Sequence, residues 1–220
     1  NEDLEAYPRD FEKDSALVRE LGGDVLYAPE PENMYAPDHA TWVEVPALAN
    51  TLCGLSRPIH FRGVCTVVLK LFMLAQPSLA VFGEKDWQQL AIIKKMVSDL
   101  NVPVEVVGRP IVREADGLAL SSRNVYLTPE ERAQAPQIRK SLEMAAGLAA
   151  GGERDAARII EAVRGYLAEH LPTGEEDYIS IVDPAVLTKV DRIEDMALCA
   201  LAIRLGKARL IDNILLKVGE

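Results

Sequence analysis

Cysteine is scarce in this sequence, and its placement argues against one class of protein. The cysteines are odd in number, lie far apart and never have Cys-x-x-Cys spacing: Cys53, Cys65 and Cys199. A disulfide framework is therefore not expected, and reduced thiols are typical of a cytosolic protein. We expect a cytoplasmic location.

Histidine and positive charge are also in short supply. The three histidines are isolated from one another, which leaves no readable zinc site. With 24 basic against 34 acidic residues, the net charge is −10. The chain thus lacks the basic face that a nucleic-acid partner needs. ATP is not excluded, because it needs only a few cationic groups and a metal ion.

Long apolar runs are absent as well. The longest, Val64 to Ala75, is interrupted by Lys70 and is too short to span a bilayer. The chain opens on Asn1-Glu2-Asp3, which is unlike a signal peptide. We therefore expect a soluble protein with no membrane partner.

What the sequence does contain is a series of short apolar segments alternating with amphipathic helices. The elements expected in its first part are a loop at residues 1–9, a helix from Phe11 to Leu21 ended by Gly22-Gly23, strands at Asp24–Ala28 and Thr41–Val45, and a helix across Val64–Ala75 ended by Pro77.

The clearest βα unit follows. Leu79–Phe82 is expected to be a short buried strand, Gly83-Glu84-Lys85 a turn, and the next segment a helix with Leu90 and Ile93 on its apolar face. Val104–Val107 is the next expected strand. Such alternation predicts an α/β fold with a parallel sheet, of the Rossmann-like kind.

After about Pro110 the pattern changes. The expected elements are a helix starting at Thr128-Pro129 and running to Gly151-Gly152, a helix from Asp155 to His170, and strands at Tyr178–Asp183, Ala197–Arg204 and Ala208–Leu216, the last two joined as a hairpin around Gly206-Lys207. We place a domain boundary near Ile111. Residues 1–111 would form the parallel α/β domain and residues 112–220 a smaller α+β domain.

Two polar segments could carry chemistry. Gly83-Glu84-Lys85-Asp86, with Gln89, lies where a strand ends and a helix begins, and open parallel sheets bind ligands at that place. Lys85 would bring a cation to a phosphate, and Asp86 could hold Mg²⁺. A capping role for Asp86 and Gln89 explains the same residues, and the local pattern alone favours it.

The second segment is Leu120-Ser121-Ser122-Arg123-Asn124. Hydroxyls, backbone amides and a guanidinium can clamp a polyphosphate, although a polar linker would look similar. A third segment, Arg57 to Gly63, contains His60, for which we favour a structural role.

Taken together and in this order, these segments resemble the pantothenate synthetase (pantoate–β-alanine ligase) family. The matching segments are Arg57-Pro-x-His60-Phe61, Gly83-Glu84-Lys85-Asp86-x-Gln88-Gln89, Val112-Arg113-x-x-Asp116-Gly117-Leu118-Ala119, Leu120-Ser121-Ser122-Arg123-Asn124 and Ala208 to Asn213. The spaced set is far more specific than any one motif.

The resemblance implies a nucleotidyltransferase-type Rossmann domain that binds nucleotide and pantoate, a smaller lid domain, and a homodimer. It implies ATP-dependent joining of pantoate to β-alanine through a pantoyl adenylate, with Lys85 and Arg123 as catalytic residues and ATP and Mg²⁺ as cofactors. It assigns pantoate to Gln89, Mg²⁺ to Asp86, and ATP to a larger set: Gly83, Glu84, Lys85, Asp86, Val112, Leu120, Ser121, Ser122 and Arg123.

The sequence departs from the family in one respect. Family members begin with a strand and a His-x-Gly-His helix start, and no two histidines here are near one another. On this ground we expect an incomplete first domain and negligible ligase activity from residues 1–220 alone. Another adenylate-forming or nucleotidylyl-transferring enzyme, or a non-catalytic nucleotide-binding module, stays open at this point.

Overall fold

The computed structural model describes residues 10–219, so the loop expected at residues 1–9 lies outside the described residues. Contacts divide the chain into two units, Asn1–Thr41 and Trp42–Glu220. The boundary near Ile111 is a separate expectation, and it stays a prediction.

The first unit contains helices α1 (Phe11–Glu20) and α2 (Pro31–Met34). Asp10 is the N-cap of α1, and its side chain accepts a hydrogen bond from the Lys13 backbone amide at 3.0 Å. The strands expected at Asp24–Ala28 and Thr41–Val45 are wrong, since both segments are irregular. Apolar residues alone do not make a strand when no neighbouring chain completes the hydrogen-bond ladder.

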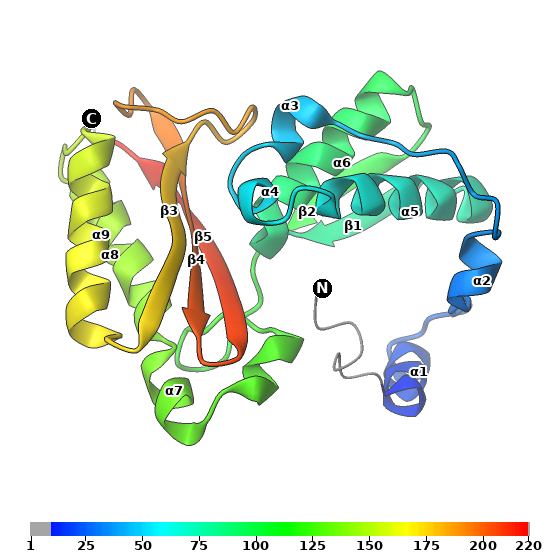
Figure 1. Ribbon diagram of the computed structural model, residues 1–220, viewed down its shortest axis with the longest axis horizontal. Helices are drawn as coiled ribbons and strands as arrows, with labels where there is room; N and C mark the ends of the chain where they lie inside the picture. The colour runs from blue at the N-terminus through cyan, green and yellow to red at the C-terminus, as the bar shows by residue number, and fades with distance from the viewer. Residues whose placement is uncertain (1–9, 220) are drawn as a thin grey trace. The chain divides into compact units, whose positions relative to one another are not determined.

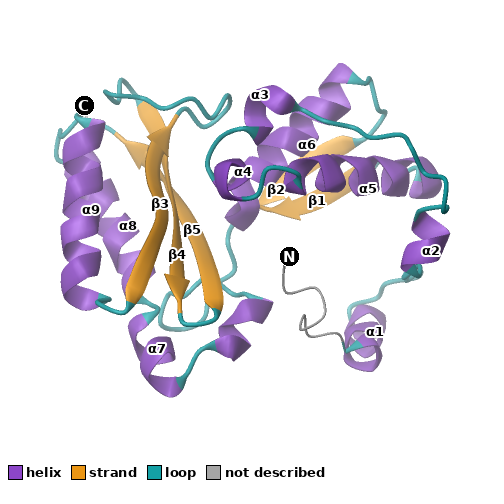
Figure 2. Cartoon of the chain, viewed as in Figure 1, coloured by secondary structure: helices purple, strands orange, loops and turns teal. Residues whose placement is uncertain are grey.

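The second unit starts with a helical layer on a small parallel sheet. Its elements, in order, are α3 (Pro46–Ala49), α4 (Cys53–Ser56), α5 (His60–Ala75), β1 (Leu79–Gly83), the 3₁₀ helix η1 (Glu84–Asp86), α6 (Trp87–Asp99) and β2 (Glu105–Arg109). β1 and β2 pair in parallel, with Leu79 opposite Glu105 and Gly83 opposite Arg109. Figure 2 shows this two-stranded sheet with α5 and α6 beside it.

The parallel βα unit is thus confirmed. The expectation that β1 is a buried strand is wrong, because part of it is exposed. The side chains of Leu79 and Val81 are 48% and 56% exposed. These two residues share one face of the strand because successive side chains alternate. The other face carries Ala80 and Phe82, which pack against a buried cluster.

The rest of the second unit is an antiparallel sheet with helices on one face. Its elements are the 3₁₀ helix η2 (Ser122–Tyr126), α7 (Pro129–Gln134), α8 (Gln137–Ala150), α9 (Ala156–His170), β3 (Gly174–Val182), β4 (Met196–Leu205) and β5 (Ala208–Lys217). The strand order is β3-β4-β5, and in Figure 1 α8 and α9 lie together on one side of this sheet.

The helix start at Thr128 is confirmed as a capping box. The Thr128 hydroxyl accepts from the Glu131 amide at 3.3 Å, and the Glu131 carboxylate accepts from the Thr128 amide at 2.9 Å. The single long helix expected after it is wrong. Pro136 has no amide hydrogen to donate, so α7 ends at Gln134 and α8 begins at Gln137.

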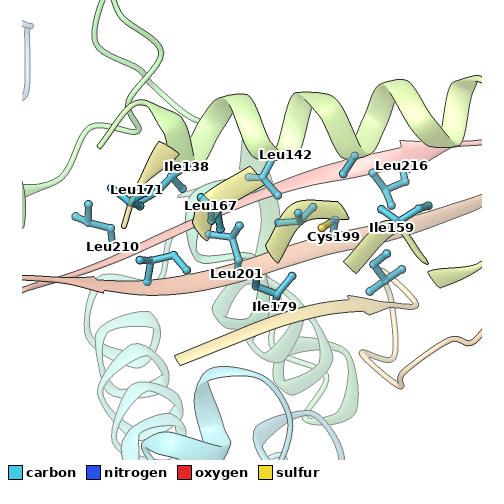
Figure 3. Packing of buried hydrophobic residues seen from close by; sticks show 14 of the residues in the cluster. Ile138, Leu142, Ile159, Leu167, Leu171, Ile179, Cys199, Leu201, Leu210 and Leu216 are labelled. Atoms are coloured by element: carbon cyan, nitrogen blue, oxygen red, sulfur yellow. The ribbon is translucent and has the colours of Figure 1, made fainter. Parts of the chain in front are cut away.

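Two hydrophobic clusters hold the second unit together. The first lies between the sheet and its two covering helices, and Figure 3 shows Ile138 and Leu142 of α8 there with Cys199 and Leu201 of β4. The second joins α5 and α6 to the other face of the same sheet. It contains residues from both sides of position 111: Phe61, Cys65, Ile92, Ile93, Met96, Val182, Leu187, Leu198 and Ala200, among others.

Candidate functional site

The Gly83–Asp86 turn carries the charged side chains of Lys85 and Asp86. Among residues 10–219, neither the Lys85 ammonium nor the Asp86 carboxylate makes a hydrogen bond or ion pair. Asp86 occupies the residue before α6, yet its side chain forms no capping hydrogen bond. The capping explanation therefore does not account for Asp86, and both groups are available to a ligand.

The Ser-Ser-Arg segment is held in a tight antiparallel loop. The Leu120 amide donates to the Val112 carbonyl at 2.9 Å, and the Glu114 amide donates to the Leu118 carbonyl at 2.8 Å. These bonds bring Val112 next to Leu120. Both side chains are exposed.

Ion pairs and side-chain hydrogen bonds also hold the same loop in place. The Arg132 guanidinium donates to carboxylate oxygens of Glu114 and Asp116, each at 2.6 Å. These bonds lower the pKa of both carboxyls. The Asn124 side-chain amide donates to the Glu114 carboxylate at 2.8 Å and to the Ala119 carbonyl at 3.2 Å. The segment is therefore a fixed loop and not a loose linker.

The lysine turn and the serine loop meet at one pocket. Lys85 and Ser121 are both on its wall, although 36 positions separate them in sequence. The rest of the lining comes from Leu118, Ala119, Ile138, Leu210, Ile211 and Asp212. In the part of the chain that the structure covers, Arg123 is not among the lining residues. Its backbone amide donates to the Ser121 hydroxyl at 3.2 Å.

Two neighbouring glutamines on α6 have different environments. Gln89 is half-buried and makes no hydrogen bond within the described chain, so its amide is available for a substrate. Gln88 is buried, and its side chain bonds the Cys53 amide and the carbonyls of Leu48 and Thr51. Sequence reasoning missed this role. The signal was helical spacing, since Gln88 precedes buried Ile92 by four residues.

Sequence reasoning also missed a group on β5. The Asn213 side-chain amide donates to the carbonyls of Glu84 at 2.9 Å and Lys85 at 3.0 Å. Its neighbour Asp212 accepts two hydrogen bonds from Arg113, at 2.7 and 2.9 Å. Arg113 also donates to the Gly117 carbonyl at 3.0 Å. Nothing local in the sequence indicates the contacts of Asn213 and Asp212, because they join segments about 100 or more positions apart.

A second polar group links α4 to the sheet away from the pocket. Arg209 donates to Asp177 at 2.6 Å, and Ser56 donates to the same carboxylate oxygen at 3.1 Å. Burial raises the pKa of Asp177, but these bonds outweigh it and leave the pKa lowered. His60, in the third sequence segment, lies 3.2 Å from an Arg57 nitrogen and edge-on to Phe61. These contacts agree with a structural role.

Among residues 10–219, no group of three or more His, Cys, Asp or Glu side chains could hold a metal ion. Within that same range, every helix is too short or too polar to cross a membrane.

Comparison with known proteins gives a consistent result. Residues 1–215 match the family model described as pantoate-beta-alanine ligase. The chain is 66% identical over 219 residues to the pantothenate synthetase of Nitratidesulfovibrio vulgaris (strain Miyazaki F), covering 100% of this chain and 77% of that protein. The corresponding enzyme of Solidesulfovibrio magneticus is 61% identical over 212 residues, covering 96% and 74%.

Solved structures agree with these relatives. The crystal structure of pantothenate synthetase from Thermus thermophilus matches with a TM-score of 0.93 at 47% identity, over 97% of this chain and 77% of that one. A pantoate-beta-alanine ligase from Francisella tularensis, complexed with beta-gamma ATP and beta-alanine, matches with a TM-score of 0.75 at 30% identity, over 97% and 72%. The α/β fold with a parallel sheet and a separate antiparallel sheet is therefore confirmed, and the chain belongs to the pantoate–β-alanine ligase family.

Proposed function

We propose that the intact protein to which this chain belongs catalyses the ATP-dependent ligation of pantoate and β-alanine to pantothenate through a pantoyl adenylate, releasing AMP and pyrophosphate. The observation that carries the proposal is that Lys85 and Asp86, at the end of β1, make no side-chain hydrogen bond within residues 10–219. The small pocket that Lys85 shares with Ser121 has room for only about one water and marks where the two segments meet. The Francisella relative, 30% identical, was solved with beta-gamma ATP and beta-alanine, which supports the same ligand classes here.

In the first half-reaction, a pantoate carboxylate oxygen attacks the α-phosphorus of ATP. The bond from that phosphorus to the bridging oxygen breaks, and pyrophosphate leaves. Lys85 supplies a positive charge to the phosphates, and Arg123 supplies a second one from the serine loop. Preorganised charges of this kind stabilise the transition state without a covalent enzyme nucleophile.

The remaining proposed contacts divide between the two segments and α6. The nucleotide is held by both loops, through Gly83, Glu84, Lys85, Asp86, Val112, Leu120, Ser121, Ser122 and Arg123. Gln89, whose amide makes no hydrogen bond within residues 10–219, binds pantoate.

Asp86 is the proposed ligand for Mg²⁺. Its carboxylate is exposed and unbonded within the described chain. Magnesium in nucleotide sites usually takes only one or two protein carboxylates, with phosphate and water oxygens completing the shell. A lone carboxylate beside Lys85 fits that requirement, and the bound ion would neutralise phosphate charge.

In the second half-reaction, the β-alanine amine attacks the activated acyl carbon. The bond from that carbon to the AMP oxygen breaks, the amine loses a proton, and pantothenate and AMP are released. The chain's part in this step is to hold the two reactants in line and to keep water out.

The direct test is isotope exchange with the purified intact protein, whereas residues 1–220 alone are expected to show negligible ligase activity. We expect exchange of labelled pyrophosphate into ATP that requires pantoate, and AMP formation that requires β-alanine in addition. Exchange supported by another carboxylic acid and not by pantoate would point to a different adenylate-forming enzyme. ATP binding without any exchange would point to a non-catalytic module.

Family resemblance also supports a domain boundary near Ile111, a homodimer and a cytoplasmic location. Light scattering of the purified protein measures the oligomeric state, and a mass of one chain would contradict the dimer.

A further inference from the structure

Two consecutive residues of strand β5, Asp212 and Asn213, contact different segments of the proposed site. Asp212 contacts Arg113 before the serine loop, and Asn213 contacts the lysine turn. Leu210 and Leu216 of β5 belong to the cluster beneath α8 and α9, whereas Ile211 and Leu215 pack against the cluster containing α5 and α6. Because side chains alternate along a strand, Asp212 belongs to the first face and Asn213 to the second.

Asn213 fixes the backbone of the lysine turn. Its side chain is 7% exposed and donates to two successive carbonyls, those of Glu84 and Lys85. Two carbonyl acceptors require the amide nitrogen at that position, which settles the orientation of the Asn213 side chain. These bonds hold the residue from which the Lys85 side chain extends.

Asp212 fixes the other segment. Its carboxylate is 3% exposed and is held by both terminal nitrogens of Arg113. Arg113 then holds the Gly117 carbonyl, just before Leu118, Ala119 and Ser121 reach the pocket wall. Both the lysine turn and the serine loop are thus held by strand β5, which fixes the spacing between them.

We propose that Asn213 and Asp212 are positioning residues for adenylation, with Asn213 acting through Lys85 and Asp212 acting through the Arg113-held loop. The proposal rests on the function proposed for Lys85. It assigns to Asn213 no contact with substrate, so the effect of Asn213 on the reaction passes through the turn it holds, and mainly through the placement of Lys85.

The test is a double-mutant cycle with Asn213→Leu and Lys85→Ala, read by pantoate-dependent pyrophosphate exchange. Leucine has the same number and branching of side-chain heavy atoms as asparagine but donates no hydrogen bond. We expect Asn213→Leu to slow exchange about tenfold when Lys85 is present, the value of roughly one lost hydrogen bond in the transition state. In the Lys85→Ala background it should have almost no further effect, because coupled residues are not additive.

Equal losses in both backgrounds would overturn the inference and indicate a general structural role for Asn213. No loss in either background would overturn it as well. If Asn213→Leu does not fold, as judged by thermal unfolding, Asn213→Ser replaces it in the same cycle. Absence of pantoate-dependent exchange in the unmutated protein would instead refute the proposed function, so the two failures are distinguishable.

Discussion

The side-chain amide nitrogen of Gln88 lies 2.7 Å from the carbonyl oxygen of Thr51 and 2.8 Å from that of Leu48. The same side chain accepts from the Cys53 amide at 3.0 Å. One buried residue at the start of α6 therefore satisfies three backbone groups between the middle of α3 and the start of α4. This stretch contains a short irregular connection, and it depends on Gln88 for those hydrogen bonds.

Replacing Gln88 by leucine is expected to destabilise the protein. The substitution keeps the apolar volume but leaves the three backbone groups without their partner, at a combined cost of about 3 kcal/mol. Urea denaturation at neutral pH measures the loss. The matched control is Gln89→Leu, for which we expect a change below about 1 kcal/mol. Equal destabilisation by both substitutions would contradict this explanation.

Gln89→Leu is expected to affect substrate binding instead. The Gln89 amide makes no hydrogen bond within residues 10–219, and a lost hydrogen bond to pantoate would raise the KM for pantoate about tenfold. Steady-state kinetics with ATP saturating measures this change. An unaltered KM would remove Gln89 from the proposed pantoate site.

Lys85→Ala is expected to leave the fold intact and to slow adenylation strongly. A unit charge pair at about 4 Å is worth about 4 kcal/mol at an effective dielectric of 20. At about 1.4 kcal/mol per tenfold, adenylation should fall by roughly two to three orders of magnitude. Single-turnover pyrophosphate release measures the rate. Lys94→Ala, at an exposed lysine of α6, is the control and should behave like the unmutated protein. Normal release from Lys85→Ala would exclude Lys85 from the chemistry.

Stability should depend on acid through the loop anchored by Arg132. Bonds from Arg132 lower the pKa of Glu114 and Asp116 in the folded protein. A lowered carboxyl pKa stabilises the fold at neutral pH, and that contribution is lost as pH falls through the folded pKa values. We expect Arg132→Gln to lose less stability than the unmutated protein between about pH 6 and about pH 3.

Denaturant unfolding at several pH values measures this difference. Arg192→Gln is the control, because the Arg192 guanidinium is exposed and lies 4.0 Å from the Glu194 carboxylate, at the limit of an ion pair. It should keep the normal acid dependence. If the Arg132 and Arg192 variants respond to acid in the same way, the Arg132 bonds contribute nothing to the pH dependence.

Much of the fold could be predicted because local signals coincide with the final structure. The strand ending at Gly83, the helix that follows and the hairpin at Gly206 were each marked by apolar periodicity together with a turn residue. Gly206 has a φ of +56°, a conformation that glycine adopts without strain. The strand expected at Thr41–Val45 failed because its partner was only assumed. The backbone there turns instead to the Thr66 hydroxyl, which accepts from the Val43 amide at 3.1 Å.

The residues of the candidate site also fall into two groups, those that the sequence indicates and those that only the three-dimensional structure shows. The turn at Lys85 and the loop at Ser121 could be assigned only through the ordered set of motifs that resembles the family, because the local pattern of each favoured a structural role. In the structure, Lys85 and Ser121 line one small pocket. Asn213 could not be recognised as part of the site, because its contacts are to backbone atoms 128 and 129 positions earlier. Backbone carbonyls leave no trace in a residue pattern, so groups that hold a site by its main chain appear only in three dimensions.

The cluster that contains Ile92 and Ile93 also contains Leu198 and Ala200, which has a consequence for how the protein comes apart. Residues on either side of position 111 share one hydrophobic core. Cleaving the chain at that point would therefore expose apolar surface on both fragments. We therefore expect Trp42–Glu220 to unfold as one cooperative unit, so that neither part stays folded when the other is unfolded.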